Sequence, residues 1–128
     1  MRLLLDTHAF LWFILDDPQL SAGANRLISD PNHDIEVSPA SYWEIAIKIK
    51  LGKYSLPQPY QSFMETHISA NDITILPILP KHTALLTTME LHHKDPFDRL
   101  LLAQALTENI PIVSADTQFD AYSVQRFW

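Results

Sequence analysis

The sequence predicts an α/β fold, with a parallel sheet at its centre and helices on both of its faces. Short apolar runs, such as Leu3–Leu5 and 110–114, alternate with longer segments whose apolar residues recur at helical spacing. A short run that is apolar throughout is typical of a strand buried on both faces. Strands that alternate with helices indicate parallel pairing. The chain of 128 residues is expected to form one domain, residues 1–128.

The first strand runs through Leu3–Leu5 and is ended by Asp6. In open α/β sheets ligands bind just outside the carboxyl ends of the strands, so Asp6 lies where such a fold performs its chemistry. Asp is also a good helix N-cap, and this stretch alone supports both roles equally. A helix that is apolar on nearly all sides is expected from His8 to Leu15, and Asp17-Pro18 ends it.

Helix start and stop signals define most of the remaining elements. Ser21 is a candidate N-cap for the next helix, and Ser38-Pro39 opens a third one that Gly52 is placed to terminate. The remaining expected elements are helices at 20–28, 39–51, 60–69, 81–91 and 96–106, and strands at 35–37, 73–76, 110–114 and 123–128, the last as an edge strand.

Composition narrows the classes of function. The formal net charge of −6 argues against a broad phosphate-binding surface, although a local basic patch can still hold a nucleic-acid backbone. There is no cysteine, which excludes a disulfide framework and thiolate metal ligands. No apolar run suits a membrane span or a signal peptide, so a soluble cytoplasmic protein is expected. The candidates for a basic patch are Arg2, Lys48, Lys50, Lys53, Lys94 and Arg99.

Acidic residues gather at one edge of the predicted sheet. Asp6 and Asp116 follow strands, Glu44 lies in the helix after the second strand, and Asp98 opens the helix after the His92-His93 loop. Carboxylates at one edge repel one another unless a cation joins them. Ligands that are all oxygen suit a hard ion, Mg²⁺ or Mn²⁺. Such an ion activates water and carries the charge of an in-line displacement at phosphorus.

Each acid also has a structural interpretation. Glu44 could pair with Lys48 on a helix surface, but its apolar and aromatic neighbours leave little obvious solvent face and favour function. Asp95 is a natural N-cap before Pro96. Asp98 would stand at the third helical position, from which a side chain points back toward the helix start and the sheet edge, and this favours a metal ligand.

The other candidates stay open at this point. Asp116 could equally well cap a turn that begins at Thr117. The histidines His8, His92 and His93 could be metal ligands, although a lone histidine is more often structural.

Read together, several motifs resemble the PIN-domain family, and most of all its bacterial VapC-type toxin branch. The motifs are LDTH from Leu5 to His8, SPASYWEIAIK from Ser38 to Lys48, DPFDRLLLAQA from Asp95 to Ala105, and SAD from Ser114 to Asp116. Their order is specific, and the resemblance covers essentially the whole chain. It implies a compact three-layer α/β/α sandwich with a central, mostly parallel sheet.

The resemblance also implies an activity. It indicates a Mg²⁺- or Mn²⁺-dependent endoribonuclease, the toxin of a toxin–antitoxin pair, which forms a homodimer and is inhibited by a cognate antitoxin. The family's catalytic and metal-binding acids correspond to Asp6, Glu44, Asp98 and Asp116. Asp95 is an extra acid, expected to lie behind the metal ligands. His8 stands where many relatives have Asn or Ser, which leaves its role open.

The partners expected on this basis are RNA, an antitoxin and a second copy of the chain. RNA bases would stack on aromatic rings, and the candidates are Trp12, Tyr54 and Tyr60. Leu20 and Leu27 in the early helices are expected to be buried between subunits. An Arg or Lys of the antitoxin is expected to enter the acidic cleft, because a guanidinium forks well onto carboxylates.

Other classes fit the motifs less well. A phosphatase similar to the haloacid dehalogenases needs a second acid two residues after the first, and His8 occupies that place. A receiver-like phosphoacceptor module needs paired acids before its first helix, which the sequence lacks. The remaining alternative is a non-catalytic PIN-like module that binds RNA or protein. Mg²⁺-dependent RNA cleavage that is lost in Asp6→Asn would separate an enzyme from that module.

Overall fold

The computed structural model describes residues 1–128 and contains a five-stranded sheet in the order β3-β2-β1-β4-β5. The strands are β1 (Arg2–Leu5), β2 (Asp34–Val37), β3 (Thr74–Ile75), β4 (Ile112–Val113) and β5 (Arg126–Phe127). The helices are α1 (Thr7–Ile14), α2 (Ala22–Ser29), α3 (Pro39–Lys50), α4 (Tyr60–Ala70), α5 (Pro80–Leu86) and α6 (Pro96–Glu108), followed by the short 3-10 helix η1 (Thr117–Ala121). Every strand pair is parallel, which confirms the predicted pairing.

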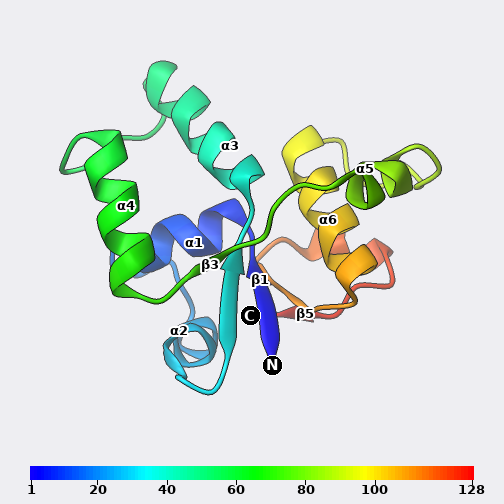
Figure 1. Cartoon of the computed structure of the whole chain (residues 1–128), viewed down its shortest axis with the longest axis horizontal. Coiled ribbons are helices and arrows are strands. Elements are labelled where there is room, and N and C mark those ends of the chain that lie inside the picture. The colour runs from blue at the N-terminus through cyan, green and yellow to red at the C-terminus, as the bar shows by residue number, and fades with distance from the viewer.

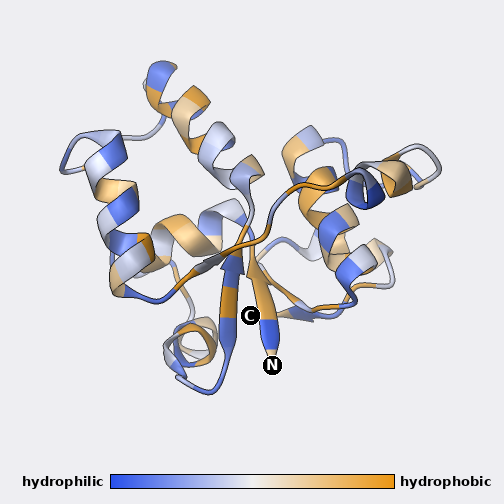
Figure 2. Ribbon diagram, viewed as in Figure 1, coloured by the Kyte–Doolittle hydropathy of each residue, from blue (hydrophilic) through white to orange (hydrophobic).

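The central strand β1 separates two apolar cores. Leu3 and Leu5 are buried in a cluster with α1–α4, whereas Leu4 is buried on the other face with α6 and η1. Figure 1 shows the same division, with α1–α4 on one side of the strands and α5 and α6 on the other. In Figure 2 the apolar colour follows β1 and the helix surfaces that face the sheet. The predicted α/β/α sandwich is therefore the observed fold.

Capping residues set where the helices begin and end. A side-chain oxygen accepts a backbone N–H bond in the first turn of α1, α2, α3, α6 and η1, and the residues that cap them are Asp6, Ser21, Ser38, Asp95 and Asp116. Helix α3 stops just before Gly52, whose φ of 76° lies in the left-handed region that ends many helices. None of the helices is both long and apolar enough to cross a membrane.

Several predicted elements are shorter than expected. The helix predicted at 81–91 ends at Leu86. The hydroxyls of Thr87 and Thr88 donate to carbonyl oxygens three residues earlier and so compete with further helical bonds. The strands predicted at 73–76, 110–114 and 123–128 have two residues each. Pro77 and Pro111 lie beside β3 and β4, and proline has no N–H to extend a ladder.

The leucines expected at a subunit contact pack within the chain. Leu20 and Leu27 are both half-buried against the core beneath α1–α4. They therefore offer a partner less apolar surface than their spacing in the sequence suggests. The homodimer itself stays a prediction.

Opposite charges neutralise one another on the α5–α6 face of the sheet. Arg2 donates to Glu36 at 2.6 Å and to Glu108 at 3.2 Å. The buried His82 accepts a backbone N–H at Nδ1 and donates from Nε2 to Glu108 at 2.9 Å. Hydrogen bonds from Lys81, then His82 and Arg2, lower the pKa of Glu108 to about 2. Arg2 is thus committed to the fold and is not part of a free basic patch.

We expect Leu4→Ala to lower the free energy of unfolding by about 3 kcal/mol, because it leaves a cavity between the sheet and α6. Leu4 is 0% exposed in the structure. Leu51, which is 63% exposed at the end of α3, provides the control. Leu51→Ala is expected to change the same quantity by less than about 0.5 kcal/mol. Urea unfolding followed by circular dichroism measures both, and equal losses would contradict the packing around β1.

Candidate active site

The acids predicted from the sequence come from separate segments that converge beyond the carboxyl ends of β1 and β4. They are Asp6 after β1, Glu44 in α3, Asp98 in α6 and Asp116 after β4. In Figure 1, β1 and β2 point toward the side of the molecule on which α3 and α6 begin. The sheet topology therefore brings together residues that are far apart along the chain.

Asp6 is buried, with only 5% of its surface exposed. Its Oδ1 accepts the backbone N–H of Ala9 at 2.8 Å, and its Oδ2 accepts the hydroxyl of Ser114. Burial is the main cause that raises the pKa of Asp6 above its ordinary value. The N-cap that the sequence allowed is therefore present, and the same carboxylate also lies at the acidic edge. The two roles of Asp6 are compatible.

Glu44 is a buried carboxylate with one oxygen paired and one unpaired. Its Oε2 accepts from Lys48 Nζ at 2.6 Å, so the predicted ion pair forms, but the Glu44 side chain is only 4% exposed. Its Oε1 is buried and has no hydrogen-bond partner. A buried carboxylate oxygen without a donor is costly and calls for a ligand or an ion. Lys48 is committed to this pair.

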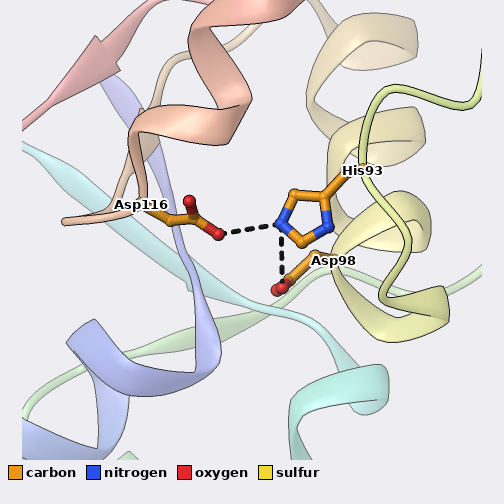
Figure 3. A group of neighbouring side chains, drawn as sticks. All are labelled: His93, Asp98 and Asp116. Atoms are coloured by element: carbon orange, nitrogen blue, oxygen red, sulfur yellow. Dashed lines mark hydrogen bonds and ion pairs between the residues drawn. The ribbon is translucent and has the colours of Figure 1, made fainter.

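His93 joins Asp98 and Asp116, as Figure 3 shows. His93 Nε2 lies 2.8 Å from Asp116 Oδ2 and 3.3 Å from Asp98 Oδ2. One ligand atom from each of these residues fits within a 4.8 Å group that could hold a metal ion. Asp6 and Glu44 lie outside this tightest group, so the structure brings only part of the predicted acid set into that close contact.

The charges of the predicted acids nevertheless affect one another. Burial, followed by the negative charge of Asp95, raises the pKa of Asp98 to about 8. The same shift receives contributions from the charges of Asp6, Glu44 and Asp116. Each ionised neighbour disfavours ionisation of the next carboxylate. The acids therefore form one cluster of like charge, in which Asp98 is affected by the charge of each of the others.

Asp95 has the capping role that the sequence favoured. Its Oδ1 accepts the backbone N–H groups of Phe97 and Asp98 at 2.8 and 3.1 Å. The cap fixes the first turn of α6 and hence the direction of Asp98.

Of the three candidate histidines, only His93 reaches the acids. His8 is exposed, and its Nε2 lies 2.9 Å from the hydroxyl of Tyr54. His92 is exposed and pairs with Glu90 at 2.8 Å. His93 is 4% exposed. Its position two residues before Asp95 was the signal available in the sequence, but spacing alone did not reveal the contact with Asp116.

A residue that sequence reasoning did not single out is Ser114. It is fully buried at the end of β4, where its hydroxyl donates to Asp6 and accepts the backbone N–H of Asp116 at 2.9 Å. This single hydroxyl fixes Asp6 relative to the turn that carries Asp116. Its place in the SAD motif was the only hint of this role.

The aromatic residues nominated as base-stacking groups already have contacts within the chain. Trp12 stacks on His8 with ring centroids 5.3 Å apart. The hydroxyl of Tyr54 bonds to His8, and that of Tyr60 donates to the carbonyl oxygen of Tyr42 at 3.1 Å. None of the three is fully exposed.

A different aromatic pair borders the acids. Trp43 is 64% exposed and packs edge-to-face on Phe97, with ring centroids 5.3 Å apart. These rings directly precede Glu44 and Asp98 in the sequence and connect α3 to α6. The stretch around Glu44 therefore has more solvent face than its apolar and aromatic neighbours suggest, although Glu44 itself is buried. The remaining basic candidates, which form no salt bridge in the structure, are Lys50, Lys53, Lys94 and Arg99.

Comparison with known proteins supports the same architecture. A family model described as PIN domain matches residues 3–125. No curated protein matched the sequence.

Solved structures of similar fold include VapBC2 from Rickettsia felis bound to a promoter DNA fragment, with a TM-score of 0.72 and 20% identity over 99% of this chain and 98% of that chain. FitAcB from Neisseria gonorrhoeae matches with a TM-score of 0.66 and 18% identity, over 98% and 96% of the two chains. VapBC-1 from nontypeable Haemophilus influenzae matches with a TM-score of 0.61 and 16% identity, over 99% and 97%.

The raised pKa of Asp98 makes a prediction for the metal-free protein. The folded state keeps a proton on Asp98 up to a pKa of about 8, whereas the ordinary pKa of an aspartate is 3.8. The contribution of Asp98 to the free energy of unfolding is therefore full below about pH 4 and is lost as pH rises to about 8. Asp98→Asn should flatten this decline.

The measurement is urea unfolding in EDTA across that pH range. Glu65→Gln, at an exposed position of α4, is the control and should keep the wild-type slope. If Asp98→Asn declines as steeply as the wild type, Asp98 is not crowded by the other acids.

Proposed function

The chain belongs to the PIN domain family, and we propose that it is a Mg²⁺- or Mn²⁺-dependent endoribonuclease. PIN domains are, as a family, metal-dependent nucleases. The observation that carries the proposal is the buried Glu44 Oε1, which has no hydrogen-bond donor. It belongs to a cluster in which burial, followed by the negative charges of neighbouring carboxylates, raises the pKa of Asp98 to about 8. A cation that prefers oxygen ligands would bind the unpaired Glu44 oxygen and offset the negative charge of the cluster.

The residues present fit such an ion. Its ligands would come from Asp6, Glu44, Asp98 and Asp116, all of which offer oxygen. When bound, Mg²⁺ or Mn²⁺ neutralises the cluster and activates water for hydrolysis of a phosphodiester bond. Lys48 and Ser114 each hold one carboxylate oxygen of a ligand in place. Asp95 would support the site indirectly, because its cap on α6 sets the direction of Asp98.

The Trp43–Phe97 pair, in which Trp43 is exposed and Phe97 is half-buried, supports a single-stranded substrate. Bases of single strands stack on exposed aromatic rings, whereas a paired helix hides their faces. Trp43 lies directly before Glu44, so a base on this ring would place its backbone near the acids. Lys94 and Arg99 flank Asp98 in the sequence and form no salt bridge, so they can meet phosphates. This local arrangement reconciles RNA binding with a net charge of −6.

We further propose that the protein is the toxin of a toxin–antitoxin pair and forms a homodimer. The similar VapBC and FitAB structures, named as complexes, support an antitoxin partner. Inhibition would come from an Arg or Lys of the antitoxin that enters the acid cluster and replaces the charge of the metal. Such a side chain would also block the path of the RNA.

We expect Asp6→Asn, Glu44→Gln and Asp98→Asn each to abolish cleavage of single-stranded RNA while the protein stays folded, because each removes a charged ligand. Asp116→Asn should cause a smaller loss. Cleavage assays with Mg²⁺ and circular dichroism on the purified variants measure this, with Glu65→Gln as the control that keeps activity.

Metal binding is tested in the same variants by thermal unfolding. Mn²⁺ at a hundred times its dissociation constant should stabilise the wild type by about 2.7 kcal/mol, and Asp6→Asn should respond much less. If the wild type neither gains stability from Mn²⁺ nor cleaves RNA, the non-catalytic alternative is correct.

Trp43→Ala should raise the KM for single-stranded RNA by roughly 5- to 150-fold, because one base loses a stacking contact of about 1–3 kcal/mol. Trp43→Phe should recover part of this loss, with little change in kcat for either variant. Leu51→Ala removes an exposed apolar side chain at the far end of α3 and is the matched control. If Trp43→Ala weakens self-association in sedimentation and leaves KM unchanged, Trp43 belongs to a subunit contact.

A further inference from the structure

His93 is the one histidine among the acids, and both of its ring nitrogens have partners. The backbone N–H of Asp95 donates to Nδ1 at 3.2 Å. On the other side, Nε2 lies 2.8 Å from Asp116 Oδ2 and 3.3 Å from Asp98 Oδ2. A nitrogen that accepts an N–H bond carries no proton of its own. The hydrogen bonds therefore place the ring proton on Nε2, directed at the carboxylates.

The surroundings of His93 hold the ring in this orientation. The ring packs on Phe119 with centroids 5.4 Å apart, and the residue is 4% exposed. Its backbone N–H donates to the hydroxyl of Tyr122 at 3.0 Å. The same hydroxyl donates to the carbonyl oxygen of Glu90 at 2.8 Å and so ties down the loop that carries the ring. His93 is thus built into the site.

From this geometry we infer that His93 is not a metal ligand but a positioning residue, whose Nε2–H orients Asp116 and Asp98 toward the ion. The inference rests on the metal site of the proposed function. As a ligand, Nε2 would have to lose its proton to Nδ1. That proton would then face the N–H of Asp95, donor against donor, at 3.2 Å. The ring is buried and packs on Phe119, and this packing opposes a turn that would relieve the conflict.

The consequence for Asp116 is that both of its oxygens are held. Oδ1 accepts the backbone N–H of Gln118 at 2.9 Å, and Oδ2 accepts from His93. A carboxylate fixed in this way keeps free lone pairs on both oxygens for an ion. Partners that orient a metal ligand from behind commonly change metal affinity or activity by about 10–100-fold when removed. The group that can hold a metal ion is therefore carboxylate-only in this protein, with histidine as its support.

The first test reads the proton directly. ¹⁵N-labelled histidine in the wild-type protein, followed by long-range ¹H–¹⁵N NMR at pH 7.5, reports which ring nitrogen carries hydrogen. His93→Gln identifies the signal. We expect His93 to be the Nε2–H form both without metal and with saturating Mg²⁺. A proton on Nδ1 in either state overturns the inference, whether or not the protein cleaves RNA.

The second test uses substitution. His93→Gln keeps an amide N–H near the position of Nε2, whereas His93→Ala removes the donor. We expect His93→Ala to need roughly 10–100-fold more Mn²⁺ for the same rise in melting temperature, and His93→Gln to need only a few-fold more. His92→Gln, at the exposed neighbouring position, is the control and should match the wild type.

The outcomes separate the inference from the proposed function. If His93→Gln loses the Mn²⁺ response as completely as His93→Ala, His93 acts as a ligand and the inference is wrong. If the wild type shows no Mn²⁺ response at all, the metal site of the proposed function fails, while the NMR measurement still decides the position of the proton. If the substituted proteins do not fold, the His93 signal is assigned in the wild type through its contact with the Phe119 ring, and the NMR result then decides alone.

Discussion

The burial of like charges at one edge of the sheet is the constraint on which the site depends. Parallel pairing of β1 with β2 and β4 aligns their carboxyl ends, and Asp6 is buried at that edge. Buried carboxylates need donors or cations, because an unpaired charge in a poorly solvated position is costly. The surrounding structure supplies some of these donors: the first turn of α1 and the hydroxyl of Ser114 for Asp6, and Lys48 for Glu44. What it leaves unsatisfied defines where a ligand belongs.

Two groups of acidic residues in the protein have opposite electrostatic environments. Beneath α5, Glu108 is surrounded by Lys81, His82 and Arg2, and its pKa falls to about 2. At the carboxyl edge, Asp98 has mainly other carboxylates as neighbours, and its pKa rises to about 8. The first arrangement is complete within the chain and stabilises the fold. The second leaves a Glu44 oxygen without a donor, and the proposed metal ion or a basic side chain of a partner would complete it.

The parts of the fold and of the site that depend on local chemistry could be predicted from the sequence. Parallel pairing, helix caps and the acids at the carboxyl edge follow from short-range patterns, and motifs in a specific order implied the PIN fold. Contacts across the sheet do not follow from such patterns. The sequence could not show that Arg2 binds Glu36, that Leu20 packs inward, or that His93 reaches Asp116, because each depends on how distant segments pack. The predicted helix continues past Thr87, and the predicted strand begins before Pro111. At Thr87 a side-chain hydrogen bond outweighs the apolar pattern, and at Pro111 the missing N–H does so.

Capping and metal binding are two interpretations of the acids, and the fold makes them compatible, so the caps do not argue against the proposed metal site. A helix N-cap holds a carboxylate at the start of a helix, and in an α/β fold the helix that follows a parallel strand starts at the sheet edge where ligands bind. Asp6 and Asp116 each give one oxygen to a backbone N–H of the turn they cap. Their other oxygens take side-chain donors, Ser114 and His93. The cap therefore helps to aim each acid, because the bond that starts the helix also orients the carboxylate, while Ser114 and His93 hold the second oxygen.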